Sequence, residues 1–172
     1  NIASTIFIDN KLKFAESRKS GIRKALSLNI EVGESNDVDG FWHVLEDNLG
    51  NRYNAKPVHT ANEMKLLMSR FPNNIRLYVA KMNGEIVGGT LIYVTPQVVH
   101  TQYISASVEG KKHGALDLLF DYIINKVYAN CRYFDFGKST EQGGAYLNEP
   151  LIFQKEGFGG RGVCYDWYQW EL

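Results

Sequence analysis

The stretch from Val98 to Gly137 reads VVHTQYISASVEGKKHGALDLLFDYIINKVYANCRYFDFG. Its first part, residues 98–106, is rich in β-branched and aromatic side chains and predicts a strand. Apolar residues then recur at spacings of three and four over residues 116–127, which predicts an amphipathic helix. A second, buried strand is expected over residues 131–136. A strand, a crossover helix and a strand form a right-handed unit, so the two strands are expected to be parallel.

The residues before this unit predict an antiparallel meander. Asn83-Gly84 is the dipeptide favoured by type I′ turns, and it separates expected strands over residues 75–82 and 85–94. The turn at residues 95–97 then leads into the strand at 98–106. The predicted sheet is therefore mostly antiparallel, with one parallel pair at its end.

Helices and short strands are expected around this sheet. Thr60 and Glu63 form a capping box ahead of an apolar stripe that Pro72 ends, so a helix is expected over residues 60–71. The other expected elements are a basic helix over 11–28, a strand over 30–34, a helix up to Leu49 capped by Asn36 or Asp37, a helix over 149–156 capped by Asn148, and a strand over 163–170. The order predicts a single mixed α/β domain over residues 1–172.

Composition excludes several classes of protein. The 172 residues include 19 basic and 19 acidic side chains, so no global charge attracts the chain to nucleic acid or to an anionic membrane. Cys131 and Cys164 lie in apolar runs and are expected to be free, buried thiols, which suits a reducing compartment. No apolar run approaches the roughly 18 residues of a membrane span. A cytoplasmic protein is expected.

Two other classes of site find little support. The stretch Gly157–Gly162 has the letters G-x-G-x-x-G of a dinucleotide fingerprint, but it follows an expected helix and precedes an expected strand. The fingerprint needs the opposite order. The four histidines and two cysteines show no ligand spacing for zinc, so no metal site is expected.

A glycine-rich basic loop is expected before the strongest helix. Residues 109–115 read EGKKHGA and follow a central strand. Free backbone N–H groups, the helix dipole and the lysines would favour a phosphate there. A solvated basic turn is the alternative reading. The candidate phosphate-binding residues are Gly110, Lys111, Lys112, His113, Gly114 and Ala115.

Polar side chains also follow the buried strand at 131–136. Active sites of α/β sheets lie at the carboxyl ends of parallel strands. Asp135, Ser139 and Glu141 are therefore candidates to orient an amine or to take its proton, with Glu141 as the preferred general base. For Asp135, a structural hydrogen-bonded carboxylate is an equal alternative. Gly137 at the strand end is expected to line the substrate side.

Candidates also lie on the strand at 98–106 and before the last helix. Tyr103 and Tyr146 are candidate proton donors to a leaving group, although a packed ring is the commoner role of a tyrosine. His100 and Gln102 are two residues apart, so they are expected on one face of the strand with Tyr103 on the other. His100 and Gln102 are therefore candidate substrate-binding residues.

The sequence resembles the Fem-like branch of the GNAT acyltransferases in three places. Residues 17–25 are similar to the basic helix R-x-x-I-R-K-A of that group, Tyr133–Gly137 to its fifth-strand motif, and Phe153–Gly159 to its F-K-x-G-F-G segment. The resemblance implies the GNAT fold and transfer of an acyl or aminoacyl group to an amine. It implies as acceptor a small-molecule amine, with an amino sugar or a cell-envelope precursor as the expected class.

The resemblance leaves the donor open. Single GNAT domains use acyl-CoA, with its pyrophosphate at a loop such as 110–115 and its carbonyl polarised by backbone N–H groups near Ile104, Ser105 and Ala106. Fem proteins use two such domains and take their donor from aminoacyl-tRNA, and this chain corresponds to the second of them. An upstream domain is therefore expected as an alternative, as is a domain that binds a ligand without chemistry. The primary expectation is an acetyl-CoA or other acyl-CoA donor.

Overall fold

A computed structural model describes residues 1–53 and 55–171. Its main sheet has seven strands in the order β2-β3-β4-β5-β6-β1-β9. These are β1 (Ile2–Phe7), β2 (Glu31–Ser35), β3 (Ile75–Met82), β4 (Glu85–Val94), β5 (Val98–Ala106), β6 (Tyr133–Lys138) and β9 (Arg161–Cys164). A second, two-stranded sheet consists of β7 (Thr140–Glu141) and β8 (Tyr146–Leu147).

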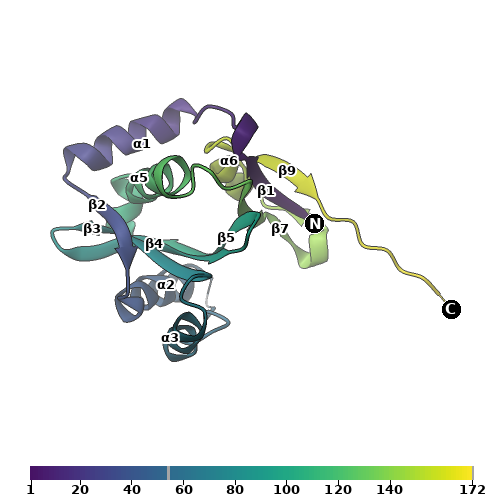
Figure 1. Cartoon of the computed structure of the whole chain (residues 1–172), viewed down its shortest axis with the longest axis horizontal. Coiled ribbons are helices and arrows are strands. Elements are labelled where there is room, and N and C mark those ends of the chain that lie inside the picture. The colour runs from purple at the N-terminus through teal and green to yellow at the C-terminus, as the bar shows by residue number, and fades with distance from the viewer. Residues whose placement is uncertain (54, 172) are drawn as a thin grey trace.

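Helices cover both faces of the main sheet. They are α1 (Glu16–Ser27), α2 (Val38–Tyr53), α3 (Ala61–Arg70), α4 (Val108–Lys112), α5 (Ala115–Tyr122) and α6 (Glu149–Glu156), with a π-helix η2 (Ile123–Val127) and 3₁₀ turns η1 (Ile8–Asn10) and η3 (Gln142–Gly144). Figure 1 shows α1 and α5 on one side of the sheet and α2 and α3 on the other. Each side has its own apolar core, with Phe120 and Phe134 central to the first and Phe41 and Trp42 to the second. The mixed α/β class is confirmed.

The parallel pair in this sheet is short. Neighbouring strands are antiparallel except β5 and β6, which pair in parallel only from Val98↔Tyr133 to His100↔Asp135. Beyond that point β5 continues to Ala106 and β6 to Lys138 without pairing to each other. The predicted parallel pair is confirmed, and it separates into a V.

Local capping signals predicted helix starts and turns well. Thr60 and Glu63 form both bonds of the capping box at the start of α3. Asp37 Oδ1 accepts the N–H of Gly40 at 2.9 Å, so Asp37, not Asn36, caps α2. Asn148 caps α6, because its Oδ1 accepts the N–H of Leu151. These bonds satisfy N–H groups that the first turn of a helix leaves free.

Several expected boundaries were wrong. The first helix begins at Glu16, because residue 15 is extended and its N–H donates to the carbonyl of Gly157. The expected loop before the strongest helix contains α4, which Ser107 caps. The expected strand at 131–136 is shifted to β6, because its residues pair with β1 up to Lys138.

The two ends of the chain differ most from expectation. Strand β1 was not predicted, although it lies between β6 and β9 inside the sheet. The final strand was expected over 163–170, but it ends at Cys164, opposite Ile2. Tyr165 N donates to the carbonyl of Asn1 at 2.7 Å, and residues 166–171 have no regular structure, because β1 offers no further partner. Both thiols are free, but neither is fully buried: Cys131 is half-buried and Cys164 is exposed.

Candidate functional site

A β-bulge at Gln102 decides which side chains of β5 share a face. Tyr103 pairs with Leu91 of β4 and Thr101 pairs with Ile92, which directly follows Leu91. Gln102 is therefore an extra residue without a partner on β4. A bulge shifts the alternation of side chains by one. His100 and Tyr103 therefore lie on the same face of the sheet, the face that α2 and α3 cover in part. The expectation that they lie on opposite faces was wrong.

His100 and Asp135 form a hydrogen-bonded pair where β5 and β6 begin to separate. The His100 Nδ1–H donates to Asp135 Oδ2 at 2.7 Å. Thr5 Oγ1 and the backbone N–H of Gly137 donate to Asp135 Oδ1 at 3.0 Å and 3.1 Å. Burial raises the pKa of Asp135, but these three hydrogen bonds outweigh it and hold the pKa below its usual value.

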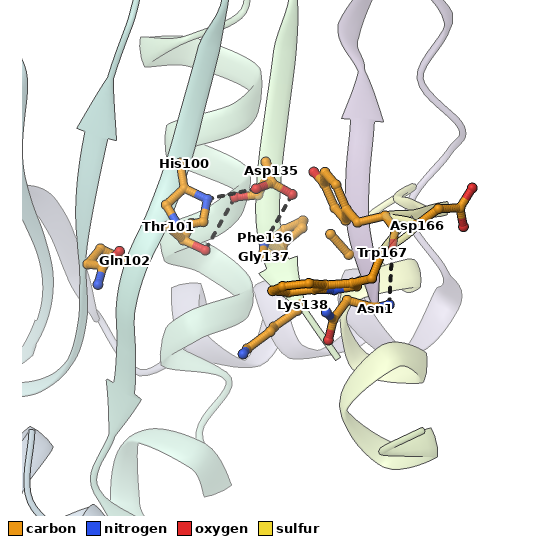
Figure 2. Close-up of a pocket in the computed structure, with 12 residues that line it drawn as sticks. Asn1, His100, Thr101, Gln102, Asp135, Phe136, Gly137, Lys138, Asp166 and Trp167 are labelled. Atoms are coloured by element: carbon orange, nitrogen blue, oxygen red, sulfur yellow. Dashed lines mark hydrogen bonds and ion pairs between the residues drawn. The ribbon is translucent and has the colours of Figure 1, made fainter. Parts of the chain in front are cut away.

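A cavity of about 850 Å³ opens beside this pair. Figure 2 shows His100, Asp135 and Gln102 on one side of it, with Trp167 of the C-terminal segment facing them. Of the expected substrate-side residues, His100, Gln102 and Gly137 line this cavity together. We refer to it as the acceptor cavity.

A second cavity of about 280 Å³ lies further along the separated strands. Its lining includes Ile104, Ser105 and Ala106 of β5, the three residues expected to contact the acyl donor. Phe136 of β6, Lys111 of α4, Phe158 and side chains from α2, α5 and α6 complete it, so Lys111 is the one described residue of the expected phosphate loop that lines this cavity. We refer to it as the donor cleft. Because Phe136 also lines the acceptor cavity, the two adjoin at this residue.

Lys155 of α6 is a buried cation in the donor cleft. The residue is 6% exposed, and its Nζ donates to the carbonyl oxygens of Gly137 and Lys138 at 3.1 Å and 2.8 Å. Burial lowers the pKa of Lys155 to about 8, against the opposing charge of Asp135. An ammonium group in a partly dry cleft can stabilise negative charge on a carbonyl oxygen.

The structure gives the expected phosphate loop other bonding partners. Within α4, the N–H of Lys111 donates to the carbonyl of Ser107 and the N–H of His113 to that of Glu109. The N–H of Gly110 donates to Ser107 Oγ. Lys111 contacts Asn48, while Lys112 and His113 pair with Glu109.

The glycines of this segment are required by packing. A Cβ at Gly110 would meet the carbonyl oxygen of Val87 at 2.0 Å, and one at Gly114 would meet that of Gly21 at 2.4 Å. Gly114 also has a φ of 73° and is followed by Ala115, which is fully buried at the start of α5. The glycines therefore let α4 and α5 approach β4 and α1.

Tyr103 has a partner that sequence alone did not suggest. Its hydroxyl lies 2.7 Å from Nδ1 of His59, which precedes α3. The ring of Trp42 meets that of Tyr103 edge to face, and the indole N–H donates to the carbonyl of His59 at 3.1 Å. Tyr103 is thus packed on the α2 and α3 side of the sheet.

Three expected catalytic or substrate residues lie apart from the His100–Asp135 pair. Glu141 is exposed, and its Oε1 accepts from Asn148 at 2.7 Å. Tyr146 pairs with Glu141 in the small sheet and is 53% exposed. Ser139 is 1% exposed, with its backbone N–H bonded to the carbonyl of Ile2. None of the three lines the acceptor cavity or the donor cleft as described.

Sequence reasoning missed two residues of this site. Lys155 lies in a short helix among charged and polar residues, where a lysine ordinarily reads as solvated. Thr5 lies in the strand that was not predicted. The F-K-x-G-F-G resemblance included Lys155 and was the available signal for it.

Residues 1–53 and 55–171 contain neither a membrane-spanning helix nor a cluster of metal ligands. No helix in this part of the chain is both long and apolar enough to cross a bilayer. In the same residues, no group of three or more histidine, cysteine, aspartate or glutamate side chains is arranged to hold a metal ion.

A family model described as an acetyltransferase (GNAT) domain matches residues 13–146. No curated protein is significantly similar in sequence. The crystal structure of FemX is similar in fold, with a TM-score of 0.69 at 13% identity over 94% of this chain and 59% of FemX. The structure of L-PGS from Bacillus licheniformis has a TM-score of 0.66 at 14% identity over 94% of this chain and 57% of that one. The chain therefore spans less than two thirds of either protein.

A smaller neighbour matches over nearly its whole length. AAC(6′)-Iy in complex with the bisubstrate analogue CoA-S-monomethyl-acetylneamine has a TM-score of 0.58 at 12% identity, over 84% of this chain and 99% of that one. At these identities the likeness concerns the fold. The GNAT fold that the sequence resemblance implied is thereby confirmed, and FemX provides its Fem-like counterpart.

Proposed function

The chain belongs to the family of GNAT acetyltransferase domains, and we propose that it is an N-acyltransferase that moves an acyl group from acyl-CoA to an amine. The observation that carries the proposal is the donor cleft between the separated ends of β5 and β6. The cleft is lined by β5 residues whose edge toward β6 is unpaired, and it contains the buried ammonium group of Lys155.

The chemistry follows from this arrangement. The amine nitrogen attacks the carbonyl carbon of the thioester, the new C–N bond forms, and the C–S bond breaks to release the thiol of CoA. Negative charge that develops on the carbonyl oxygen would be stabilised by Lys155 and by backbone N–H groups of β5. Holding donor and amine in adjoining cavities supplies much of the rate through proximity.

The acceptor is proposed to bind in the acceptor cavity. That cavity combines aromatic rings, including Trp167, with the carboxylates of Asp135 and Asp166. Aromatic faces pack against sugar rings and carboxylates attract ammonium groups, so an amino sugar or an amine-bearing cell-envelope precursor suits this lining. A location in the cytoplasm, where acyl-CoA is available, is part of the same proposal.

Thermal denaturation with acetyl-CoA tests the donor. A donor at 100 times its Kd stabilises the folded state by about 2.7 kcal/mol, so a rise in Tm is expected. ADP at the same concentration is the control, because it lacks the pantetheine arm that the donor cleft would hold. Release of free thiol with a panel of amines then measures turnover. A Tm that millimolar acetyl-CoA leaves unchanged would exclude this donor.

One observation counts against a pyrophosphate on α4 and leaves aminoacyl-tRNA, which the Fem-like resemblance implied, as the second candidate donor. The amide groups of Gly110, Lys111 and His113 are already bonded within α4, so they are not available to a pyrophosphate. Binding of an aminoacyl-tRNA should weaken steeply between 50 and 200 mM salt, because several phosphates would be contacted. Binding of charged tRNA without any effect of acetyl-CoA would favour this donor over the first.

A further inference from the structure

The His100–Asp135 pair has a fixed orientation. Asp135 accepts hydrogen bonds from the imidazole Nδ1–H, from Thr5 Oγ1 and from the backbone N–H of Gly137. An ionised carboxylate can only accept, so Nδ1 of His100 carries a proton. In the neutral imidazole the free lone pair is then on Nε2.

The two members of the pair differ in what they can do. The three donors around Asp135 hold its pKa below the usual value, which makes the carboxylate a poor proton acceptor near neutral pH. The His100 side chain is 34% exposed and lines the acceptor cavity. Within residues 1–53 and 55–171, no hydrogen bond to its Nε2 is found. Figure 2 shows the ring beside Asp135 at the wall of the cavity.

The pair also lies at the place where donor and acceptor would meet. His100↔Asp135 is the last paired position before β5 and β6 separate. Two features follow at once on the two strands: the bulge at Gln102 on β5, and Phe136, a residue that lines both cavities, on β6. If a donor fills the donor cleft with its thioester toward the place where β5 and β6 separate, that thioester would therefore lie near His100 and Asp135.

We propose that His100 is the proton acceptor of the transfer reaction and that Asp135 is the residue that positions it. The inference rests on the proposed function. Nε2 takes a proton from the amine as its nitrogen bonds to the carbonyl carbon, the C–S bond breaks, and the leaving thiolate takes a proton from water. The imidazolium, stabilised by the Asp135 carboxylate, then returns its proton to solvent.

Other ionisable groups lie beside His100 or line the same cavity. Tyr93 is its neighbour across β4 on the same face, and burial raises the pKa of Tyr93, so it stays neutral. Lys138 and Asp166 line the same cavity, from β6 and from the C-terminal segment. The activity should fall as the pH is lowered, because protonation of the imidazole removes the acceptor.

Two substitutions test the assignment with acetyl-CoA and an amine that the wild-type chain acylates. His100→Asn retains a donor at the position of Nδ1, and it should lower kcat by 10²- to 10⁴-fold with little change in the KM for acetyl-CoA. The decrease in rate at acidic pH that protonation of the imidazole causes should be absent from this variant. Asp135→Asn should lower kcat by a similar factor, because Thr5 and Gly137 would hold the amide oxygen and its NH2 would then face His100 Nδ1. That contact favours the tautomer with its proton on Nε2, which cannot accept a proton from the amine.

Matched controls separate this role from a structural one. Asp39→Asn makes the same change at an exposed carboxylate that pairs with Lys65, and it should leave kcat unchanged. Thermal melts should show that all variants fold. The same amine is used throughout, so its own titration contributes equally to every profile.

The outcomes distinguish the inference from the function on which it rests. A wild-type chain that acylates no amine refutes the proposed function, and the assignment of His100 fails with it. If the wild-type chain is active but His100→Asn keeps a kcat within a few-fold of the wild type, the role of His100 alone is refuted. The same holds if the rate of His100→Asn falls at acidic pH as the wild-type rate does.

Discussion

Lys155 makes the stability of the fold depend on pH in an unusual direction. An ordinary lysine has a pKa near 10.5, whereas burial lowers that of Lys155 to about 8. Below pH 8 the side chain is charged in both the folded and the unfolded state, and the folded state bears the cost of a buried charge. Between pH 8 and 10.5 the folded state has released the proton that the unfolded chain still holds. The free energy of unfolding should therefore rise over this interval.

The size of the effect follows from the difference in pKa. A shift from 10.5 to about 8, at 1.36 kcal/mol for each pKa unit, corresponds to about 3 kcal/mol. Lys155→Met keeps an unbranched apolar side chain of similar length and removes the titration. The variant also loses the bonds to the carbonyls of Gly137 and Lys138, so its stability at pH 7 is not the informative quantity.

Urea denaturation at several pH values from 7 to 10.5 measures the prediction. Tyrosines and exposed lysines titrate in both proteins, so the quantity of interest is the free energy of unfolding of the wild type minus that of Lys155→Met. This difference should grow in favour of the wild type by about 3 kcal/mol across the interval. A difference that stays constant with pH would show that Lys155 has an ordinary pKa in the folded state, and the burial argument would be refuted.

Two further predictions concern packing and charge. Gly110→Ala should destabilise the fold by on the order of 3 kcal/mol in urea denaturation, because its Cβ would lie 2.0 Å from a backbone carbonyl oxygen of β4. The matched control Gly50→Ala, in open space within α2, should instead stabilise it by about 1 kcal/mol, and equal effects would contradict the packing argument. Arg18→Met should cost on the order of 3 kcal/mol, because it leaves the buried Asp117 without its 2.7 Å ion pair. Lys19→Met, which breaks an exposed pair on the same helix, should cost far less, and a similar loss in both variants would argue against a special role for Asp117.

Signals that act within a few residues allowed much of the fold to be predicted. The capping box at Thr60 and Glu63, the Asn83-Gly84 turn and the cap at Asn148 each depend on bonds between near neighbours in the chain, and each is confirmed. The apolar stripe that precedes β6 likewise predicted the crossover helix. The parallel pair followed from the short crossover alone.

Features that depend on distant partners were not predicted. The bulge at Gln102 comes from the register between β4 and β5, which the sequence of β5 does not reveal, and it reversed the expected face of Tyr103. Strand β1 is stabilised by β6 and β9, which lie more than a hundred residues away in sequence. Lys155 is buried because α6 packs against β1 and β9 and its ammonium group bonds to two carbonyls of β6, so its environment too is set by tertiary contacts.

Gly137 connects the acceptor cavity and the donor cleft through bonds of its backbone. Gly137 has a φ of 71°, which glycine adopts readily, and it lies at the irregularity in the β1–β6 pairing. Its N–H donates to Asp135 in the acceptor cavity, while its carbonyl accepts from Lys155 in the donor cleft. The peptide groups on either side of this glycine therefore hold the anion that orients the proposed base and the cation that would face the acyl carbonyl. A side chain at residue 137 would disturb both groups together, and the proposed reaction needs both in place.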